Sequence, residues 1–570
     1  MLKMWRSNPR LLLDDCLLIM IMAVLAACGL IYEYLLSHYS ARVLGSMETV
    51  IYAMIGIMIV AMGLGAFAAK QVKDPYFGFA WLEVSVALLG CSATVILASL
   101  IGFTQYLPQV IADTFSIPQD MLPLGGVYAS LVKLSQFMPY VFGFVLGFLI
   151  GMEIPLIARI REDVYGKHLT NNVGTIYGAD YLGAGVGAAV WVLLMLRIEI
   201  NQAAALTASL NWVAGVIFFV RFRRQIKAKL WLIVSHLVLA VMVYFVFAFG
   251  GQWSSKMQDL LYLDKVVHQQ QTRFQNLVFT RRDMSGGLPS VYSFYINGRL
   301  QFSSADEHIY HQMLVHPAMA VSARHDRVLI VGGGDGLALR EVLKWPVNDV
   351  TLVDLDDELV DLFRQPEGLL APYLVEVVED LTQGAFSDPR VKVINNDAFV
   401  ELDNFLSRGA QFDTIIVDLP DPSHPDLNKL YSKYFYARLG QLLYGDGAMV
   451  VQSTSPYHAR KAFISIGKTI EAAGFAHVEQ YQQNVPSFGQ WGWSIATKMG
   501  AAPSERAAQL TPFLPFQLDW LNQDVFAAAL VFPQQFYAGS EQIEVNELGT
   551  HTLYQYHHLA WQAELGLSAQ

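Results

Sequence analysis

The chain has 570 residues, which is too long for a single hydrophobic core and predicts several domains. Hydrophobic residues make up 54% of it and charged residues only 15%, whereas charged residues are about a quarter of an average soluble domain. The formal net charge of -11 argues against nucleic acid as a partner and favours cations.

Seven apolar stretches before residue 252 are long enough to cross the hydrocarbon core of a bilayer, which is about 30 Å thick. They cover residues 16–36, 50–69, 77–103, 135–158, 175–196, 203–220 and 230–250. Lys3, Arg6 and Arg10 precede the first stretch, as in a signal peptide, but it is long, lacks a convincing cleavage site and is followed by further spans. The sequence therefore predicts a multi-pass α-helical domain over residues 1–251, embedded in the lipid bilayer of the cell (inner) membrane.

Glycines recur every four residues at two places in these stretches. Gly143, Gly147 and Gly151 form one series, and Gly183 and Gly187 form the other. Small residues at this spacing let two helices approach closely in lipid. We therefore predict that both series lie at contacts between helices.

Four acidic residues lie within these stretches or at their ends: Glu33, Glu83, Glu153 and Asp180. Ionisable groups are costly at such depth, which makes them candidates for a function. Two interpretations stay open, hydrogen bonding between helices or near the headgroups, and a cavity that binds a cation.

Beyond residue 252, short apolar strands alternate with helical patterns, which is typical of a parallel α/β sheet. The predicted strands are 328–331, 350–353, 391–394, 414–417 and 448–452. Ahead of them, residues 266–303 alternate in polarity and have turn signals at 285–287 and 297–298, which indicates a small antiparallel hairpin unit. We expect a β-rich lead-in over 252–310, a Rossmann-like α/β domain over 311–500 and a C-terminal extension over 501–570.

A glycine loop follows the first strand of this α/β pattern. It contains Gly332, Gly333, Gly334 and Gly336, and a helical pattern begins directly after it. Glycines let the backbone adopt positive φ and approach a ligand closely. Asp335 lies inside the loop, where a site for pyrophosphate would not place an acid. The loop therefore favours a nucleoside that carries positive charge.

Acidic residues also follow the next two strands. Asp354 comes 22 residues after Gly332, close to the spacing of about 20 residues at which nucleotide-binding folds place an acid on ribose hydroxyls. Asp397 follows the third strand, where it could accept a hydrogen bond from an adenine amino group or cap a helix. Both alternatives for Asp397 remain open.

The fourth strand leads into a loop stiffened by two prolines, which presents Asp418 and Asp421 three residues apart. A carboxylate there could accept a proton from an attacking amine or hold a polycation. The alternatives are a metal site and a plain solvated turn. A metal is disfavoured, because no His or Cys residues accompany the acids at the spacing of metal ligands.

Several short motifs occur in order along residues 262–500. They are Phe274-Gln275, 296–301 (Ile-Asn-Gly-Arg-Leu-Gln), 306–311 (Asp-Glu-His-Ile-Tyr-His), 332–336 with Arg340-Glu341, Asp354, Asp397-Ala398, 418–422 (Asp-Leu-Pro-Asp-Pro) and Gln452. In this set the chain resembles the polyamine aminopropyltransferases, that is, the spermidine synthases, and methyltransferases of the same fold do not carry the set. The seven-span front end is similar to that of the membrane-bound bacterial members. The resemblance thus implies a methyltransferase-type Rossmann-like domain behind a membrane domain.

The resemblance implies transfer of an aminopropyl group from decarboxylated S-adenosylmethionine, the co-substrate, to putrescine or another polyamine. Methylthioadenosine would be released, no tightly bound cofactor would be needed, and a homo-oligomer is compatible with the resemblance. Asp418 would accept the proton and Asp421 would hold the attacking amine, while Asp335 and His311 would bind the aminopropyl and amine end. The residues that would surround methylthioadenosine are Gln275, Asp354, Asp397, Ala398 and Pro425, and Tyr310, Gln301 and Gln452 would line the same cleft.

The chain departs from the soluble members of that family at three places. Leu337 stands where they often have another glycine, and Asp354 replaces their usual glutamate. Residues 485–493 lack, in the expected frame, the tyrosine that they use near the amine, so the resemblance does not identify the acceptor. Two other functions stay open: an S-adenosylmethionine-dependent methyltransferase, and a polyamine transporter or sensor whose soluble part only binds.

The basic residues around the spans bear on orientation, because cytoplasmic loops carry an excess of Lys and Arg. Those that fall on one side are Lys3, Arg6, Arg10, Lys70, Lys73, Arg159, Arg161, Lys167, Arg221, Arg223, Arg224, Lys227 and Lys229. Seven spans would then place the catalytic domain outside, whereas the implied co-substrate is cytosolic. Either one stretch does not cross, with 230–250 the candidate, or the domain works outside with substrate delivered through the membrane half.

Overall fold

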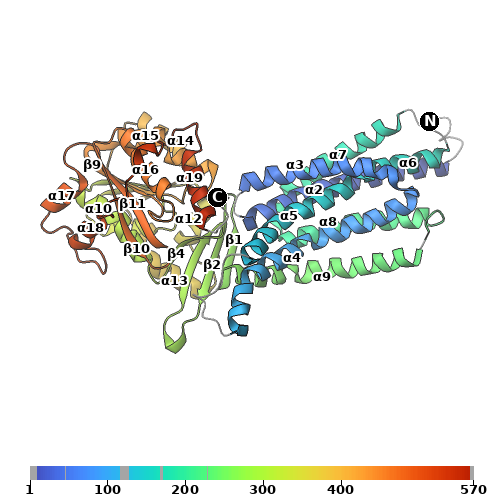
Figure 1. The fold of residues 1–570 in the computed structure, drawn as a ribbon, viewed down its shortest axis with the longest axis horizontal. Coiled ribbons are helices and arrows are strands. Elements are labelled where there is room, and N and C mark those ends of the chain that lie inside the picture. Colours follow the sequence, from blue (N-terminus) through green and yellow to red (C-terminus); the bar gives the residue numbers. More distant parts are fainter. Residues whose placement is uncertain are drawn as a thin grey trace. The chain divides into compact units, whose positions relative to one another are not determined.

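The computed structural model describes residues 9–44, 47–115, 127–166, 171–227, 229–262 and 264–564. The basic residues Lys3, Arg6 and Lys167 lie outside these ranges. The chain divides into two compact units, Met1–Val266 and Val267–Gln570, whose elements are labelled in Figure 1. The finer domain limits at residues 251, 310 and 500 stay a prediction.

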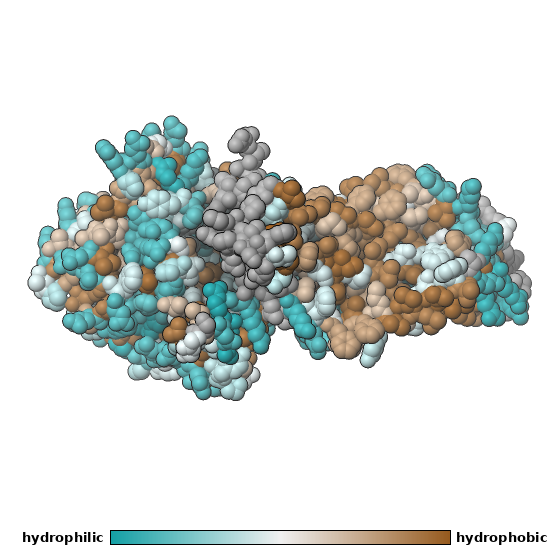
Figure 2. All heavy atoms as spheres, turned by 60° about the horizontal axis from the view of Figure 1, so that its bottom comes forward, coloured by the Kyte–Doolittle hydropathy of each residue, from teal (hydrophilic) through white to brown (hydrophobic). Residues whose placement is uncertain are grey.

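The first unit consists of long helices. They are α2 (Pro9–Leu44), α3 (Met47–Ala68), α4 (Pro75–Phe115), α5 (Val127–Gly151), α6 (Glu153–Tyr165), α7 (Asn172–Leu193), α8 (Ile200–Phe222) and α9 (Lys229–Tyr262), with short 3-10 turns η1 (Ala69–Gln71) and η3 (Met195–Arg197). Within the described residues, seven spans are long and apolar enough to cross a membrane, as predicted. The fourth, Ser130–Tyr165, comprises α5 and α6. On the face shown in Figure 2, the sides of this unit are covered by hydrophobic residues, which suits contact with lipid.

The two glycine series lie at helix contacts, which confirms that prediction. A Cβ atom on Gly147 would lie 2.8 Å from the carbonyl oxygen of Met58, and one on Gly151 would lie 2.0 Å from that of Met62. A Cβ on Gly183 would similarly meet the carbonyl oxygen of Ala23 at 2.0 Å. Helices α5 and α7 therefore pack backbone to backbone against α3 and α2, which only glycine permits at these positions.

The second unit opens with a small four-stranded sheet in the order β1-β2-β3-β4. Its strands are β1 (Lys265–Gln271), β2 (Asn276–Arg282), β3 (Val291–Ile296) and β4 (Arg299–Ser303), with the 3-10 turn η4 (Ser285–Gly287) between β2 and β3. Asn297 and Gly298 both have positive φ, 51° and 78°, in the tight turn between β3 and β4. The hairpin unit predicted from the turn signals is thus present.

A seven-stranded mixed sheet follows, in the order β10-β11-β9-β8-β5-β6-β7. Its strands are β5 (Arg327–Gly332), β6 (Asp349–Asp354), β7 (Val391–Asn395), β8 (Phe412–Asp418), β9 (Leu443–Gln452), β10 (His477–Val485) and β11 (Gly489–Thr497). The first five of these confirm the predicted strands, and neighbours among them pair in parallel. The antiparallel pair β10 and β11 was not predicted.

Helices cover both faces of this sheet, as expected for the predicted Rossmann-like domain. They are α10 (Glu307–Val321), α11 (Leu337–Leu343), α12 (Asp357–Arg364), α13 (Pro372–Thr382), α14 (Ala398–Ser407), α15 (Lys433–Leu442), α16 (Arg460–Ala472), α17 (Pro503–Gln509), α18 (Gln523–Ala529) and α19 (Thr552–Glu564), with 3-10 turns η5 (Ala385–Ser387), η6 (Pro425–Tyr431) and η7 (Ser540–Gln542). Val328 and Ile330 pack in the core with α10 and α11, whereas Leu329 and Val331 pack in the core with α14, α15 and α16. Because β5 is buried on both faces, its ligand-binding groups must lie at its carboxyl end.

Candidate active site

The glycine loop connects β5 to α11 and lies between the ends of β8 and β6. Gly332 has φ of 82°, and a Cβ atom there would lie 2.1 Å from the carbonyl oxygen of Asp418. A Cβ on Gly334 would lie 2.8 Å from Oδ2 of Asp354, and the Gly334 N–H donates to that oxygen at 3.1 Å. In addition, the N–H of Gly333 donates to the Asp418 carbonyl oxygen at 3.0 Å. The glycines therefore let the chain pack against its own neighbouring strand ends.

Asp418 ends β8 and faces residues of α10 and of the glycine loop. The Tyr310 hydroxyl donates to Asp418 Oδ1 at 2.8 Å. Burial, together with the negative charge of Asp335, raises the pKa of Asp418 to about 6, although His311 and Tyr310 oppose the shift. Burial also raises the pKa of Asp335, whose Oδ1 accepts from the Leu337 N–H at 3.0 Å. Asp418 and Asp335 thus form a pair of carboxyl groups that would gain from a cationic ligand.

His311 is held in place by a buried ion pair beneath it. Its Nδ1 lies 2.8 Å from Glu307 Oε2, and the Arg340 guanidinium donates to both oxygens of the Glu307 carboxylate at 2.8 and 2.9 Å. Burial opposes protonation of His311, but Glu307, Asp335 and Asp418 outweigh it and raise its pKa. A cationic imidazole beside Asp335 and Asp418 favours their ionised forms.

Asp354 ends β6 and was predicted to contact a ribose. Its Oδ1 accepts from the Asp356 N–H at 2.9 Å, and burial raises its pKa to about 7 despite that bond. Gln275, on the turn between β1 and β2, hydrogen-bonds to Asp356. The structure therefore brings Asp354 beside the glycine loop and ties Gln275 to the same strand end through Asp356.

Asp397 caps a helix, which was one of its two predicted roles. Its Oδ1 accepts from the Phe399 N–H at 2.9 Å at the start of α14, and its Oδ2 accepts from Lys429 Nζ at 2.7 Å. Ala398 is the first residue of α14, and Pro425 is the first residue of η6, which also contains Lys429. These residues meet beyond the end of β7 and β8, at the same sheet edge as Asp354 and Asp418.

Asp421 lies within hydrogen-bond distance of three side chains, which the sequence did not predict. Its Oδ1 lies 3.2 Å from Gln452 Nε2, and its Oδ2 lies 3.2 Å from both Thr454 Oγ1 and His557 Nε2. Burial opposes ionisation of Asp421, but the bond to His557, the charge of Arg299 and the bond to Gln452 hold its pKa below the usual range. Asp421 is therefore ionised beside the acids of higher pKa.

Gln301 of β4 hydrogen-bonds to its own strand. The Gln301 amide donates to the carbonyl oxygens of Arg299 and Leu300 on its own strand, at 3.2 and 3.4 Å. His557, by contrast, was not predicted, since it lies on α19 in the C-terminal extension and only the tertiary fold brings it to Asp421. Phe488, whose ring centroid is 5.9 Å from that of Tyr310, belongs to the segment in which no tyrosine was found.

The arrangement combines carboxyl groups of contrasting pKa within one sheet edge. Asp418 can take up a proton near neutral pH, whereas Asp421 stays ionised and can hold a cation by charge-assisted hydrogen bonds. Such a site suits proton removal from an amine whose other end is bound as an ammonium ion.

The chain is similar to known proteins over almost its whole length. The family model of the spermine/spermidine synthase domain matches residues 307–506. The polyamine aminopropyltransferase of Shewanella oneidensis is 55% identical over 554 residues, which are 97% of this chain and 96% of that protein. The polyamine aminopropyltransferase 1 of Streptomyces coelicolor is 38% identical over 91% of this chain and 90% of that protein. The solved spermidine synthase from Thermotoga maritima matches 49% of this chain and 88% of that chain, at 25% identity and a TM-score of 0.41.

Proposed function

This chain belongs to the polyamine aminopropyltransferases, and from that membership we propose that it transfers an aminopropyl group from decarboxylated S-adenosylmethionine to putrescine or a related amine, giving spermidine and methylthioadenosine. The observation that carries the proposal is Asp418, a carboxyl group with a pKa of about 6 that is aligned by Tyr310 and lies three residues before the ionised Asp421.

The reaction needs a neutral amine next to an electrophilic carbon. The amine nitrogen forms a bond to the carbon attached to the sulfonium sulfur, the carbon–sulfur bond breaks, and its electron pair stays on sulfur as the thioether of methylthioadenosine. A free alkylamine is mostly protonated at neutral pH, so a base must take the proton from nitrogen, and Asp418 has that role here. Alignment of the two substrates supplies the rest of the rate, without a metal.

The other carboxyl groups position the two substrates. Asp421 binds the distal ammonium of the acceptor, while Asp335 and His311 contact the aminopropyl end, and Asp354 contacts the ribose beside the glycine loop. The rest of the nucleoside would lie against Gln275, Asp397, Ala398 and Pro425, and Tyr310, Gln301 and Gln452 would complete the cleft.

The purified full-length chain, incubated with decarboxylated S-adenosylmethionine and putrescine, should release methylthioadenosine. Methyl transfer from S-adenosylmethionine itself would instead indicate the methyltransferase alternative. Binding of both compounds without any release would support a transporter or sensor, and the proposal would then be abandoned.

The pH dependence of turnover provides a further test. Asp418 accepts a proton only when it is ionised, and its pKa is raised to about 6, so kcat should be lost as the pH falls through that value. With both substrates saturating, we expect log kcat to fall with a slope of about one below pH 6 and to level off above it. A kcat that stays constant down to about pH 5 would exclude Asp418 as the base in this complex.

His557 should position Asp421 for the acceptor amine. In His557→Ala, Asp421 loses one of its hydrogen-bond partners, so we expect the KM for putrescine to rise about three- to tenfold while kcat changes little. His557→Gln, which keeps a donor, should restore most of the affinity. Equal losses in amine KM and in methylthioadenosine binding would indicate a general disturbance of α19 instead.

We also infer that the first unit is embedded in the cell membrane by its seven spans. A reporter fused after residue 570, active on only one side of the bilayer, will assign the side on which the catalytic domain works.

A further inference from the structure

Two carboxylates are buried inside the helical unit. Glu83 of α4 and Glu153 at the start of α6 are each 1% exposed and interact electrostatically with each other. Asn211 Nδ2 donates to Glu83 Oε2 at 2.8 Å, but Glu83 Oε1 and Glu153 Oε2 have no hydrogen-bond partner among the residues that the structure describes. Hydrogen bonding between helices was one of the two interpretations drawn from the sequence. It explains the position of Glu83 Oε2, but not the burial of these two oxygens.

Two further polar side chains lie beside them without partners in the described part of the chain. Both ring nitrogens of His236 on α9 and the hydroxyl of Tyr32 on α2 are buried and unbonded. A Cβ atom on Gly215 of α8 would lie 3.3 Å from Glu83 Cβ and 3.4 Å from His236 Cε1, so Glu83 and His236 flank the same glycine. Tyr32 interacts electrostatically with both Glu83 and Glu153. Because each unpaired buried polar group is costly, four of them in one place indicate a ligand site.

The span that carries Glu153 contains a proline two residues after it, and Met152, between α5 and α6, keeps helical backbone angles (φ -78°, ψ -18°). Helix α5 ends at Gly151 and α6 begins at Glu153, and Pro155 in the first turn of α6 has no N–H to offer to the preceding turn. Pro155 therefore removes one backbone hydrogen bond of the span beside Glu153.

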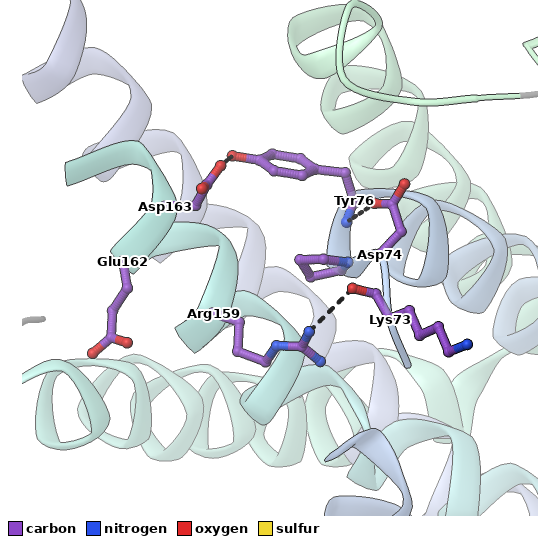
Figure 3. Close-up of a pocket in the computed structure, with 7 residues that line it drawn as sticks. Lys73, Asp74, Tyr76, Arg159, Glu162 and Asp163 are labelled. Atoms are coloured by element: carbon purple, nitrogen blue, oxygen red, sulfur yellow. Dashed lines mark hydrogen bonds between the residues drawn. The ribbon is translucent and has the colours of Figure 1, made fainter. Parts of the chain in front are cut away.

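A pocket opens at the ends of the two helices that carry these acids. Its volume is about 550 Å³, and it is lined by Lys73, Asp74 and Tyr76 around the start of α4 and by Arg159, Glu162 and Asp163 near the end of α6. In Figure 3 the Tyr76 ring points toward Asp163, and Arg159 points toward the Lys73 backbone. The Tyr76 hydroxyl donates to Asp163 Oδ2 at 2.9 Å. Glu83 lies seven residues after Tyr76, on the same helix face and roughly 10 Å deeper. Along the two helices, the buried side chains of Phe79, Leu156 and Ile160 separate this pocket from Glu83 and Glu153.

We propose that the helical unit binds an organic ammonium ion between Glu83 and Glu153, with the Tyr32 hydroxyl as a neutral partner. An ammonium group offers three N–H donors, which match the two free carboxylate oxygens and one neutral acceptor. Calcium and magnesium ions take about six or more oxygen ligands, which is more than these side chains offer. The site is independent of the proposed transfer chemistry, since Glu83 and Glu153 belong to the other compact unit.

Equilibrium binding of labelled putrescine to the full-length protein in nanodiscs tests this inference. The wild type should show two classes of site. Glu83→Gln and Glu153→Gln should each weaken binding at the site in the helical unit about tenfold or more, because charge-assisted hydrogen bonds are removed. The double variant should lose that site. Aminopropyl transfer should persist in these variants, which also reports that they are folded. Asp421→Asn should weaken only putrescine binding at the catalytic site.

Glu33→Gln is the matched control. Glu33 is another buried acid of the helical unit, but its ionisation is affected by burial and not by the charges of Glu83 or Glu153. It should keep both classes of site. The inference is wrong if the double variant binds as much putrescine as Glu33→Gln, or if the wild type shows a single class that Asp421→Asn removes. Sodium and potassium chloride at equal ionic strength should not compete, and competition by them would identify an alkali-ion site instead. Loss of transfer with both classes of binding retained would contradict the proposed function alone.

Discussion

Asp418→Asn should lower kcat by about 10²- to 10⁴-fold, the usual contribution of a general base, while methylthioadenosine binding stays close to that of the wild type. The amide has the shape of the carboxylate and can still accept the hydrogen bond that Tyr310 donates at 2.8 Å, but it cannot take a proton from the amine. The measurement is release of methylthioadenosine under saturating substrates, together with calorimetric binding of methylthioadenosine to the same preparation.

Asp413→Asn is the matched control for this experiment. Asp413 lies on the same strand, β8, where its Oδ2 accepts from the Arg327 N–H at 2.9 Å. Asp413 precedes Asp418 by five positions on this strand, or about 17 Å, so it lies near the amino end of β8, away from the proposed site. We expect its kcat to stay within about threefold of the wild type. Full activity of Asp418→Asn would show that another group removes the proton.

The parallel core of the fold was predictable because its strands are buried on both faces. A strand such as 328–331 appears in the sequence as a continuous apolar run bounded by glycines, and the structure places Val328 and Leu329 in two different cores. The edge pair β10 and β11 has no such signal, since Gln480, Gln482 and Gln483 interrupt the apolar pattern.

The candidate site was predictable as far as it follows strand ends. Asp354 and Asp418 directly end their strands, so the order of the sheet alone brings them next to the glycine loop. His557 could not be predicted, since its contact with Asp421 depends on how α19 docks. The glycines were expected to admit a ligand, yet Gly332 and Gly334 are also required by the close approach of Asp418 and Asp354.

Arg340→Met should lower the free energy of unfolding of the catalytic unit by about 3–5 kcal/mol, the usual effect of breaking a buried ion pair by removing one partner. Arg340 is 7% exposed and donates to both oxygens of Glu307, to Glu341 Oε1 at 2.9 Å and to the Leu381 carbonyl oxygen at 2.7 Å. Although burial opposes ionisation, the bonds to His311 and Arg340 lower the pKa of Glu307 to about 2, so methionine would leave it charged and poorly compensated. Denaturant unfolding of the full-length protein, followed by tryptophan fluorescence, measures the change.

Arg390→Met provides the comparison, because Arg390 also binds a carboxylate through two bonds, to Asp388 at 2.9 and 2.8 Å, but in a more exposed place. Its loss should lower the free energy of unfolding by at most about 1 kcal/mol. Adding Glu307→Gln to Arg340→Met should recover part of the stability, since it removes the charge left without its partner. If the two arginine variants were equally destabilised, burial would not be the reason for the effect, and the support of His311 by Glu307 and Arg340 would have to be explained by packing alone.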